Sequence, residues 1–215
     1  MAPASPSPAR SAGTPASERE LRSQGRRTMA KLLDAGMKVL AERGYHAARV
    51  DDVVRKARTS HGTFYLYFAN KEDLFRALAH ECADEMRALA AELGPVTPDA
   101  AGYDTVRVWL ARFMETYQRY GAVIRAWMED QVADSSLVAL GLDAFADIAG
   151  ALVDRLREAD ATHFPDPELA AAALLAMVER LMYFVTSRSA GFDDDALLDT
   201  VAGMIHRGFF GAAAT

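Results

Sequence analysis

The sequence predicts an all-α protein of about nine helices, divided into a small N-terminal domain and a larger C-terminal one. Apolar residues recur at spacings of three and four along almost the whole chain, and no segment alternates apolar and polar residues for long. Glycines, prolines and short polar clusters separate these periodic segments. With 51% hydrophobic and 25% charged residues over 215 positions, the chain is long and apolar enough to form a core.

The first segment, residues 1–25, is expected to be a disordered extension. It is rich in Ala, Pro, Ser, Gly and Thr and carries almost no large apolar side chain, so folding would not offset its loss of entropy. Four arginines, Arg19, Arg22, Arg26 and Arg27, then lead into the first helix. Both a solvated tail and an arm that lies on DNA phosphates fit this pattern.

Charge is distributed unevenly along the chain. Residues 10–76 carry 14 Lys and Arg against 8 Asp and Glu, whereas residues 77–215 carry 10 Arg against 22 acidic residues. A basic N-terminal third is compatible with nucleic-acid binding although the whole chain has a net charge of −6. The chain has one cysteine, no secretory signal pattern, and a longest apolar run, 169–178, that is short for a bilayer. These features predict a cytoplasmic protein without a membrane partner.

The expected helices follow from the periodic apolar positions and the breaks between them. The first carries Met29, Leu32, Leu33, Met37 and Leu40 and ends at Gly44, in the position after a helix where glycine is favoured. Short helices at 50–57 and 61–68 come next, and a longer one over 71–93 ends at "GPVTP". The remaining helices are expected at 103–119, 122–132, 136–159, 167–188 and 194–210. They are separated by Gly121, Ser135-Ser136, "HFPDP" and "SAGFDDD".

The two short helices predict a helix-turn-helix. Helices of about two turns are marginal alone, so these two need packing against the first and fourth helices. Two short helices joined by a tight turn place the second one in the major groove of DNA. Ser60 is a favourable N-cap for the free amide of Thr63. Gly62 costs helix propensity, which suits a turn that approaches another backbone closely.

The second short helix has an apolar face and a polar face. Phe64 and Phe68 are four residues apart and are expected in the core. The residues that this leaves toward the groove or its rims are His61, Thr63, Tyr65, Leu66 and Tyr67. Hydroxyl groups can donate to phosphates, and a histidine at the helix start can reach the edges of bases.

Residues 27 to about 75 resemble the N-terminal domain of the TetR/AcrR family of transcriptional regulators. The matching motif is Gly44-Tyr45 followed by "SHGTFYLYFANKEDL" at 60–74. The resemblance implies a helix-turn-helix domain at 26–86 and a helical ligand-binding and dimerisation domain at 87–215. It implies base contacts by His61, Gly62 and Tyr65 and phosphate contacts by Thr63, Tyr67 and Lys71. The full set expected at DNA is Arg49, Ser60, His61, Gly62, Thr63, Tyr65, Tyr67 and Lys71.

Two positions depart from the family pattern. Arg49 stands where the family usually has Thr or Ser just before the second helix. A guanidinium can bind phosphate but cannot accept a backbone N–H, so Asp51 and Asp52 must stabilise that helix start through the helix dipole. Arg58 stands where the family usually has glycine, and a left-handed backbone there would cost about 1 kcal/mol. Both a DNA contact and a merely tolerated residue fit Arg58.

In this family the C-terminal helices form a ligand pocket and a dimer interface. The resemblance and the broad apolar faces of the last two helices predict a four-helix dimer seam. The residues expected there are Val178, Met182, Val185, Val201, Met204 and Ile205. Large apolar residues predict a site for a small apolar or aromatic effector. They are Trp109, Phe113, Tyr117, Trp127, Met128, Met177 and Tyr183, and each also fits a plain core position. Glu129, Asp130, Glu179 and Arg180 either bind a polar group of the ligand or form surface ion pairs.

Little in the sequence indicates an enzyme, a metal or a cofactor. "HECAD" at 80–84 has aspartate where a zinc-protease motif needs its second histidine, and no phosphate-binding or dinucleotide-binding glycine motif occurs. Cys82 is expected as a buried thiol, with a single-cysteine redox sensor as the alternative. The sequence therefore predicts a homodimeric repressor that a small inducer releases from a palindromic, double-stranded DNA operator. The rival interpretations are a ligand-binding protein that has lost its operator and an enzyme built on a helical bundle.

Overall fold

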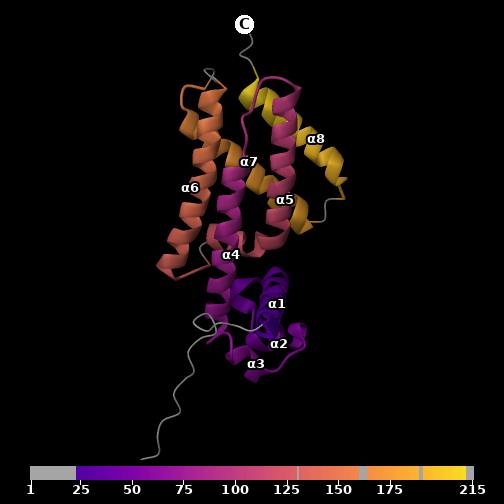
Figure 1. The fold of residues 1–215 in the computed structure, drawn as a ribbon, viewed down its shortest axis with the longest axis vertical. Coiled ribbons are helices and arrows are strands. Elements are labelled where there is room, and N and C mark those ends of the chain that lie inside the picture. The colour runs from indigo at the N-terminus through magenta and orange to yellow at the C-terminus, as the bar shows by residue number, and fades with distance from the viewer. Residues whose placement is uncertain (1–22, 130, 160–163, 189–190, 212–215) are drawn as a thin grey trace, which may run out of the picture.

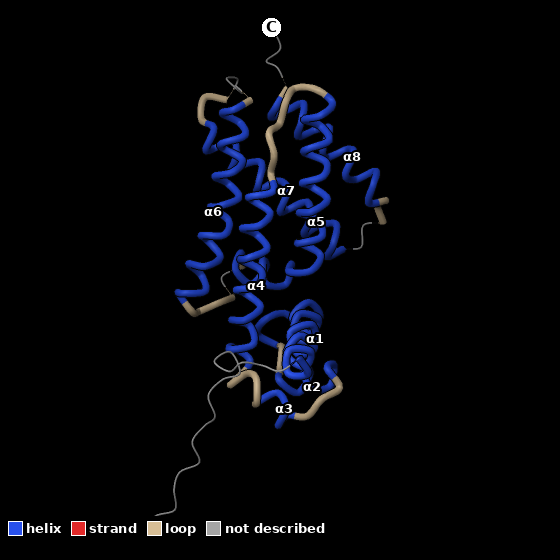
Figure 2. The backbone as a smooth tube through the Cα atoms, in the orientation of Figure 1, coloured by secondary structure: helices blue, strands red, loops and turns tan. Residues whose placement is uncertain are grey.

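In the computed structural model, the described residues, 23–129, 131–159, 164–188 and 191–211, form helices joined by loops, and no strand (Figure 2). The N-terminal helices are α1 (Ser23–Ala47), α2 (Val50–Ala57), α3 (His61–Tyr65) and α4 (Lys71–Glu92). The C-terminal helices are α5 (Ala100–Met128), α6 (Ser135–Glu158), α7 (Pro167–Arg188) and α8 (Asp194–Ile205), followed by a π-helical turn, η2 (His206–Phe210). The all-α prediction is confirmed, with eight α-helices among the described residues in place of about nine helices.

Helix α4 joins the two ends of the molecule. Its first turns pack beside α1, and its later turns pack against α5 and α6. Figure 1 shows α1, α2 and α3 gathered at one end of the elongated molecule and α5–α8 at the other. Because α4 is continuous through residue 86, the predicted domain boundary falls inside a helix. The division into 26–86 and 87–215 remains a prediction.

The first helix begins earlier and ends later than expected. Residues 23–25 were expected as the end of a disordered extension, but they are helical. Residues 1–22, which include Arg19 and Arg22, lie outside the described residues. At Gly44 the backbone has φ 73° and ψ 170°, so the helix kinks there before a last turn that ends at Ala47. The left-handed φ is the reason that glycine suits this position.

The break expected at Gly121 is wrong. Helix α5 runs through this glycine without interruption, so the two expected helices are one. A Cβ at Gly121 would lie 3.2 Å from the Tyr117 ring and 3.3 Å from Nη1 of Arg125. The glycine therefore makes room for neighbouring side chains and does not end the helix. Two other boundaries also differ, because α3 ends at Tyr65 and α8 at Ile205.

Helices α6 and α7 are long and apolar enough to cross a membrane, judged by length and composition alone. The apolar run 169–178 that the sequence singled out lies within α7 and is shorter than the helix. In the fold α6 packs against α4 and α7, and α7 also contacts α5. A buried core helix can be as apolar as a membrane-spanning helix, so length and composition alone do not place α6 and α7 in a membrane.

Candidate functional sites

The start of α2 depends on ion pairs in place of a side-chain cap. Arg49 occupies the N-cap position with φ −129° and makes no capping hydrogen bond, as its chemistry predicts. Asp52 is buried, and its Oδ1 lies 3.3 Å from Nη2 of Arg43 and accepts a hydrogen bond from Arg55. The carboxylates of the first turn therefore stabilise this helix end, where the positive end of the helix dipole favours anions.

The turn between α2 and α3 has a left-handed residue. Arg58 has φ 51° and ψ 53°, and it is the one non-glycine residue with positive φ among the residues described. Its amide donates to the carbonyl of Arg55 at 3.2 Å, and the amide of Thr59 donates to Val54 at 3.0 Å. The sequence had indicated this position, because Arg58 stands where the family usually has glycine.

Helix α3 presents one exposed face. Ser60 caps it by accepting a hydrogen bond from the Thr63 amide at 3.1 Å, which confirms the predicted cap. Phe64 and Phe68 are buried, as expected. The exposed positions are His61, Gly62, Tyr65 and Leu66, and Thr63 and Tyr67 are half-buried.

A contact between His61 and Asp51 connects the exposed face of α3 with α2. Nε2 of His61 lies 2.6 Å from Oδ1 of Asp51, and both side chains are exposed. A Cβ on Gly62 would contact no heavy atom closer than Oγ of Ser60 at 3.7 Å, so the space beside Gly62 is open. The helix thus offers a hydroxyl, an imidazole and an unobstructed backbone on one face, at the end of the molecule where α3 lies (Figure 1).

Lys71 has a structural role that sequence reasoning missed. Its Nζ donates to the carbonyl oxygens of Tyr45 at 3.2 Å and His46 at 3.4 Å, and it lies 5.1 Å from the centre of the Tyr45 ring. A cation at these last carbonyls of α1 satisfies acceptors that have no helical partner. The family motif contains both Gly44-Tyr45 and Lys71, and this shared membership was the sequence signal that could have linked Lys71 to the end of α1.

A small cavity lies between α4, α5, α6 and α7. Its volume is about 10 Å³, about the space of one water molecule. Its lining residues are Met86, Leu89, Phe113, Thr116, Tyr117, Ile124, Phe145, Ile148 and Glu179. Two of the seven residues predicted for the effector site, Phe113 and Tyr117, are among them.

The other five predicted effector residues lie elsewhere. Trp109 is a buried core residue whose Nε1 donates to the Leu89 carbonyl at 3.0 Å. Trp127 is half-buried and its indole ring packs closely against Gly141. Met128 is half exposed because it is the last residue of α5, and Met177 is exposed on the outer face of α7. Tyr183 lines surface grooves instead of this cavity.

One wall of the cavity carries a buried carboxylate. Glu179 is 4% exposed, and its Oε1 accepts a hydrogen bond from the Tyr117 hydroxyl at 2.9 Å. Burial, and next the negative charge of Glu179, raise the pKa of Tyr117. Of the other polar residues flagged by the sequence, Glu129 is exposed and Asp130 lies outside the described residues. Arg180 is exposed, with Nε 3.9 Å from Oε2 of Glu179.

An apolar groove of about 930 Å³ runs between α7 and α8. Four of the predicted dimer residues line it: Val178, Val201, Met204 and Ile205. Met182 does not, because it is fully buried in the protein's own core, and Val185 is half-buried outside the lining. Met177, Phe184 and Met204 are the exposed apolar side chains of the groove. The sequence analysis assigned Met177 to the effector site and did not single out Phe184, which also lines this groove.

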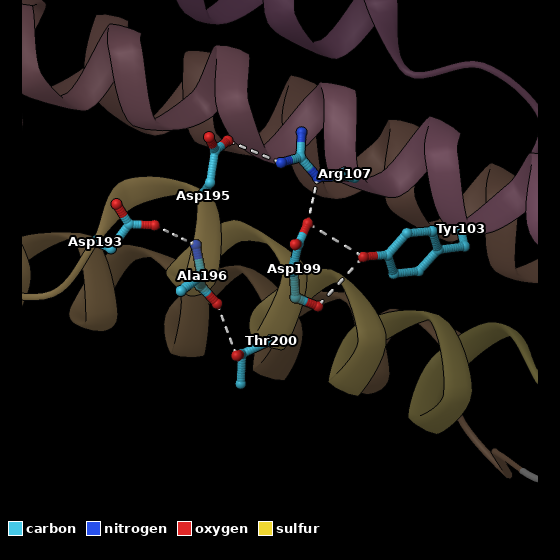
Figure 3. A network of polar contacts seen from close by, with 7 residues as sticks. All are labelled: Tyr103, Arg107, Asp193, Asp195, Ala196, Asp199 and Thr200. Atoms are coloured by element: carbon cyan, nitrogen blue, oxygen red, sulfur yellow. Dashed lines mark hydrogen bonds and ion pairs between the residues drawn. The ribbon is translucent and has the colours of Figure 1, made fainter.

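The position of α8 is fixed by a polar network on α5 (Figure 3). Arg107 donates to Asp195 at 2.9 Å and also to Asp199, and the Tyr103 hydroxyl lies 3.4 Å from the Asp199 carboxylate. The hydrogen bond from Arg107 holds the pKa of Asp199 below its usual value. Asp193 caps α8 by accepting from the Ala196 amide at 2.9 Å. These contacts hold α8, which forms one wall of the apolar groove, against α5.

Neither a metal centre nor a reactive thiol is found in the part of the chain that the structure describes. No group of three His, Cys, Asp or Glu side chains there is arranged to hold a metal ion. Cys82 is fully buried beside Met86, and burial raises the pKa of its thiol, so the thiol stays protonated and closed to solvent.

Comparison with known proteins identifies the same N-terminal region. Residues 32–78 match the family of bacterial regulatory proteins described as the tetR family. The fatty acid metabolism regulator protein of Bacillus subtilis is 43% identical over 51 residues, which are 24% of this chain and 26% of that protein. The HTH-type transcriptional repressor Rv1474c of Mycobacterium tuberculosis is 25% identical over 189 residues, which are 82% of this chain and 92% of that protein. The first curated relatives are thus matched over about a quarter of their own length.

Solved structures share the fold over most of the chain. A regulatory protein of the tetR family from Rhodococcus RHA1 superposes with a TM-score of 0.65 at 17% identity, covering 87% of this chain and 98% of that one. The transcriptional regulator FadR from Bacillus subtilis, in complex with stearoyl-CoA, gives a TM-score of 0.59 at 20% identity, covering 83% and 98%. At these identities the likeness shows the fold alone.

Proposed function

We propose that the chain, whose residues 32–78 match the tetR family of bacterial regulatory proteins, is a homodimeric transcriptional repressor of that family. It binds a palindromic operator in double-stranded DNA, in the cytoplasm, through residues 26–86. A small effector bound within residues 87–215 releases it from the operator. No cofactor takes part in this mechanism.

The exposed face of α3 is the observation that carries the proposal. Tyr65 is 57% exposed and Leu66 is 63% exposed, on a helix whose opposite side, Phe64, is fully buried. A five-residue helix that is capped by Ser60 and packed against α2 holds these side chains in fixed directions. A rigid, exposed aromatic face beside an open glycine fits a major groove.

Contacts with the DNA backbone come from the rim of this face. We assign base contacts to His61, Gly62 and Tyr65. Phosphate contacts are assigned to Arg49, Ser60, Thr63, Tyr67 and Lys71. Phosphate contacts fix the register of a protein on DNA, and base contacts set its sequence preference.

Two copies of the chain pair through the apolar groove of α7 and α8. Met177, Phe184 and Met204 are exposed there beside the buried Val201, and a second copy would cover them. A twofold axis between the copies presents two α3 helices to two half-sites, which is the reason for a palindromic operator.

The effector acts through α4. This helix lines the effector cavity with Met86 and Leu89, and its first residue, Lys71, holds the end of α1. An effector that widens the cavity shifts α4 and with it the spacing of the two α3 helices. Because the coupling is reciprocal, operator DNA weakens effector binding by the same factor.

Selection of sequences from random double-stranded DNA tests the proposed function. The purified protein is expected to enrich a palindrome, and Tyr65→Phe is expected to bind the enriched DNA more weakly with its fold unchanged. Tyr120→Phe, at a tyrosine of α5 that belongs to none of the proposed DNA, effector and dimer sites, is the matched control and should keep its affinity. If no motif is enriched, the chain is a ligand-binding protein without an operator.

A further inference from the structure

The buried Glu179 gives the effector cavity a chemical preference. Apart from Glu179, Thr116 and the Tyr117 hydroxyl, the lining side chains of this cavity are aliphatic or aromatic, or methionine. A carboxylate taken out of water into such a place is unfavourable unless other groups pair with it. Its surroundings therefore decide which ligand groups the cavity accepts.

Among the described residues, hydrogen bonding to Glu179 leaves acceptor positions of its carboxylate unoccupied. Oε1 accepts one hydrogen bond from Tyr117, whereas Oε2 lies 3.9 Å from Nε of Arg180, beyond hydrogen-bond distance. A carboxylate has about four acceptor positions. Arg180 is also exposed to solvent, which screens its charge.

We propose that Glu179 selects apolar effectors that carry a cationic amine, a statement that rests on the proposed function of this cavity as the effector site. The ammonium group would donate to the Glu179 carboxylate, and the apolar part would pack against Phe113, Phe145 and Ile148. An effector with a carboxylate would place two like charges side by side in an environment of low dielectric, which is strongly unfavourable.

Tyr117 lies between the cavity and a second groove. Its ring lines both the cavity and an outer groove of about 410 Å³ that also includes Gly121, Arg125 and Tyr183. Because the cavity holds only about 10 Å³, an effector must displace Tyr117 from Glu179 and take over its hydrogen bond. A Cβ at residue 121 would lie 3.2 Å from the Tyr117 ring, so glycine at this position leaves space beside the ring.

The outer groove has the opposite charge preference. It is lined by Arg119 and Arg125 and has no acidic residue in its lining. An acidic amphiphile would bind there, with its carboxylate on an arginine, and would leave Glu179 paired with Tyr117. The two sites are therefore separable by substituting Glu179 alone.

Two probes of the same shape test the inference: 4-phenylbutylamine, a cation at neutral pH, and 4-phenylbutyrate, an anion. Their binding to the full chain is measured by titration calorimetry without DNA. The wild-type protein is expected to bind the amine at least about tenfold more tightly than the acid, since opposite charge attracts and like charge repels in a buried site. Glu179→Gln is expected to remove this preference, and Glu129→Gln, at an exposed glutamate outside the cavity, to keep it.

A second variant keeps the test decisive if Glu179→Gln does not fold, as judged by circular dichroism. Tyr117→Phe removes the hydrogen bond from Tyr117 to Glu179 and is expected to bind the amine at least as tightly as the wild type. The inference is overturned if the acid binds as well as the amine, if the amine does not bind at millimolar concentration, or if Tyr117→Phe weakens the amine. Because no DNA is present, these results are independent of whether the protein selects an operator.

Discussion

At the scale of single residues, Arg58 holds the turn of the helix-turn-helix in an unfavourable conformation. Its φ of 51° and ψ of 53° lie in the left-handed region, which costs an L-residue about 1–2 kcal/mol. The amides of Arg58 and Thr59 both find carbonyl partners in α2, so the turn is well satisfied in spite of this strain. The cost is local and can be removed by one substitution.

Arg58→Gly is expected to raise the free energy of unfolding by about 0.5–1 kcal/mol, because relief of the strain exceeds the entropy that glycine adds to the unfolded chain. Urea unfolding followed by circular dichroism measures this. Arg49→Gly is the matched control, since φ there is −129° and glycine relieves nothing. A destabilised Arg58→Gly would contradict the expectation. A stabilised variant that binds DNA less well would show that Arg58 contacts DNA.

His61 is expected to determine one symmetric position of the operator. Its ring contacts Asp51 in the first turn of α2, with Nε2 and Oδ1 2.6 Å apart. His61→Ala is expected to relax base preference at that position by about 1–3 kcal/mol, the value of one good base contact. Selection from random DNA with the variant measures the change, with His80→Ala, an exposed histidine of α4, as the control. An unchanged motif would make His61 a helix-start residue without a base contact.

At this scale the sequence predicts what a side chain can do more reliably than where it lies. Ser60 caps α3 and Arg49 leaves α2 uncapped, because both outcomes follow from side-chain chemistry and position along one helix. The pairing of Asp52 with Arg43 depends on how α1 and α2 pack, which no local pattern contains. The role of Lys71 at the end of α1 depends on packing in the same way.

At the scale of elements, Lys71 connects α4 with the end of α1. It donates to two carbonyl oxygens there, so it has a structural role beside the proposed phosphate contact. Lys71→Met is expected to lower the free energy of unfolding by about 1 kcal/mol through the loss of these hydrogen bonds. It is also expected to lower the salt slope of operator binding by about 1 for each half-site.

The two effects of Lys71→Met are measured separately, by urea unfolding and by operator affinity at several salt concentrations. Lys38→Met, at an exposed lysine paired with Asp34 within α1, is the control and should change neither. A variant that is less stable but keeps the salt slope would restrict Lys71 to its structural role. A variant that is as stable as the wild type would contradict the hydrogen bonds described here.

Glycine shows why element boundaries were only partly predictable. Gly44 and Gly121 were both expected to end a helix. At Gly44 the backbone has positive φ and the helix kinks, whereas at Gly121 the helix continues because the Tyr117 and Arg125 side chains lie against the missing Cβ. The two cases differ in tertiary packing, so a single sequence does not separate them.

At the scale of the whole molecule, the apolar groove of α7 and α8 decides whether the protein pairs. The sequence indicated a broad apolar face on each of the last two helices. It did not separate the inward face, with Val178 and Met182, from the outward face, with Met177 and Phe184, because residues of the same type occupy both. For the same reason two of seven predicted effector residues line the cavity, and the buried Glu179 was only one of several polar candidates.

Met204→Asp is expected to turn a dimer into a monomer that keeps its helical circular dichroism, because Met204 is 60% exposed in the single chain and would face a partner. An unpaired charge buried in an interface costs several kcal/mol. Sedimentation velocity at micromolar concentration measures the change. Leu142→Asp, at a residue of α6 that is 66% exposed outside the groove, is the control and should remain dimeric.

Two other results complete the dimer test. Met182→Asp is expected to unfold the chain rather than to separate dimers, since Met182 is fully buried in the protein's own core. A Met204→Asp variant that remains dimeric would place the interface away from the groove.

The mass of the complex with operator DNA tests the central claim most directly. Sedimentation of the protein with a selected palindrome, and with the same DNA carrying one intact half-site, gives the number of chains bound to each. We expect two chains on the palindrome and a steep loss of affinity on the single half-site, because one α3 helix makes too few contacts to hold DNA at physiological salt. A single chain that binds either DNA with equal affinity would contradict a dimeric repressor that reads a palindrome.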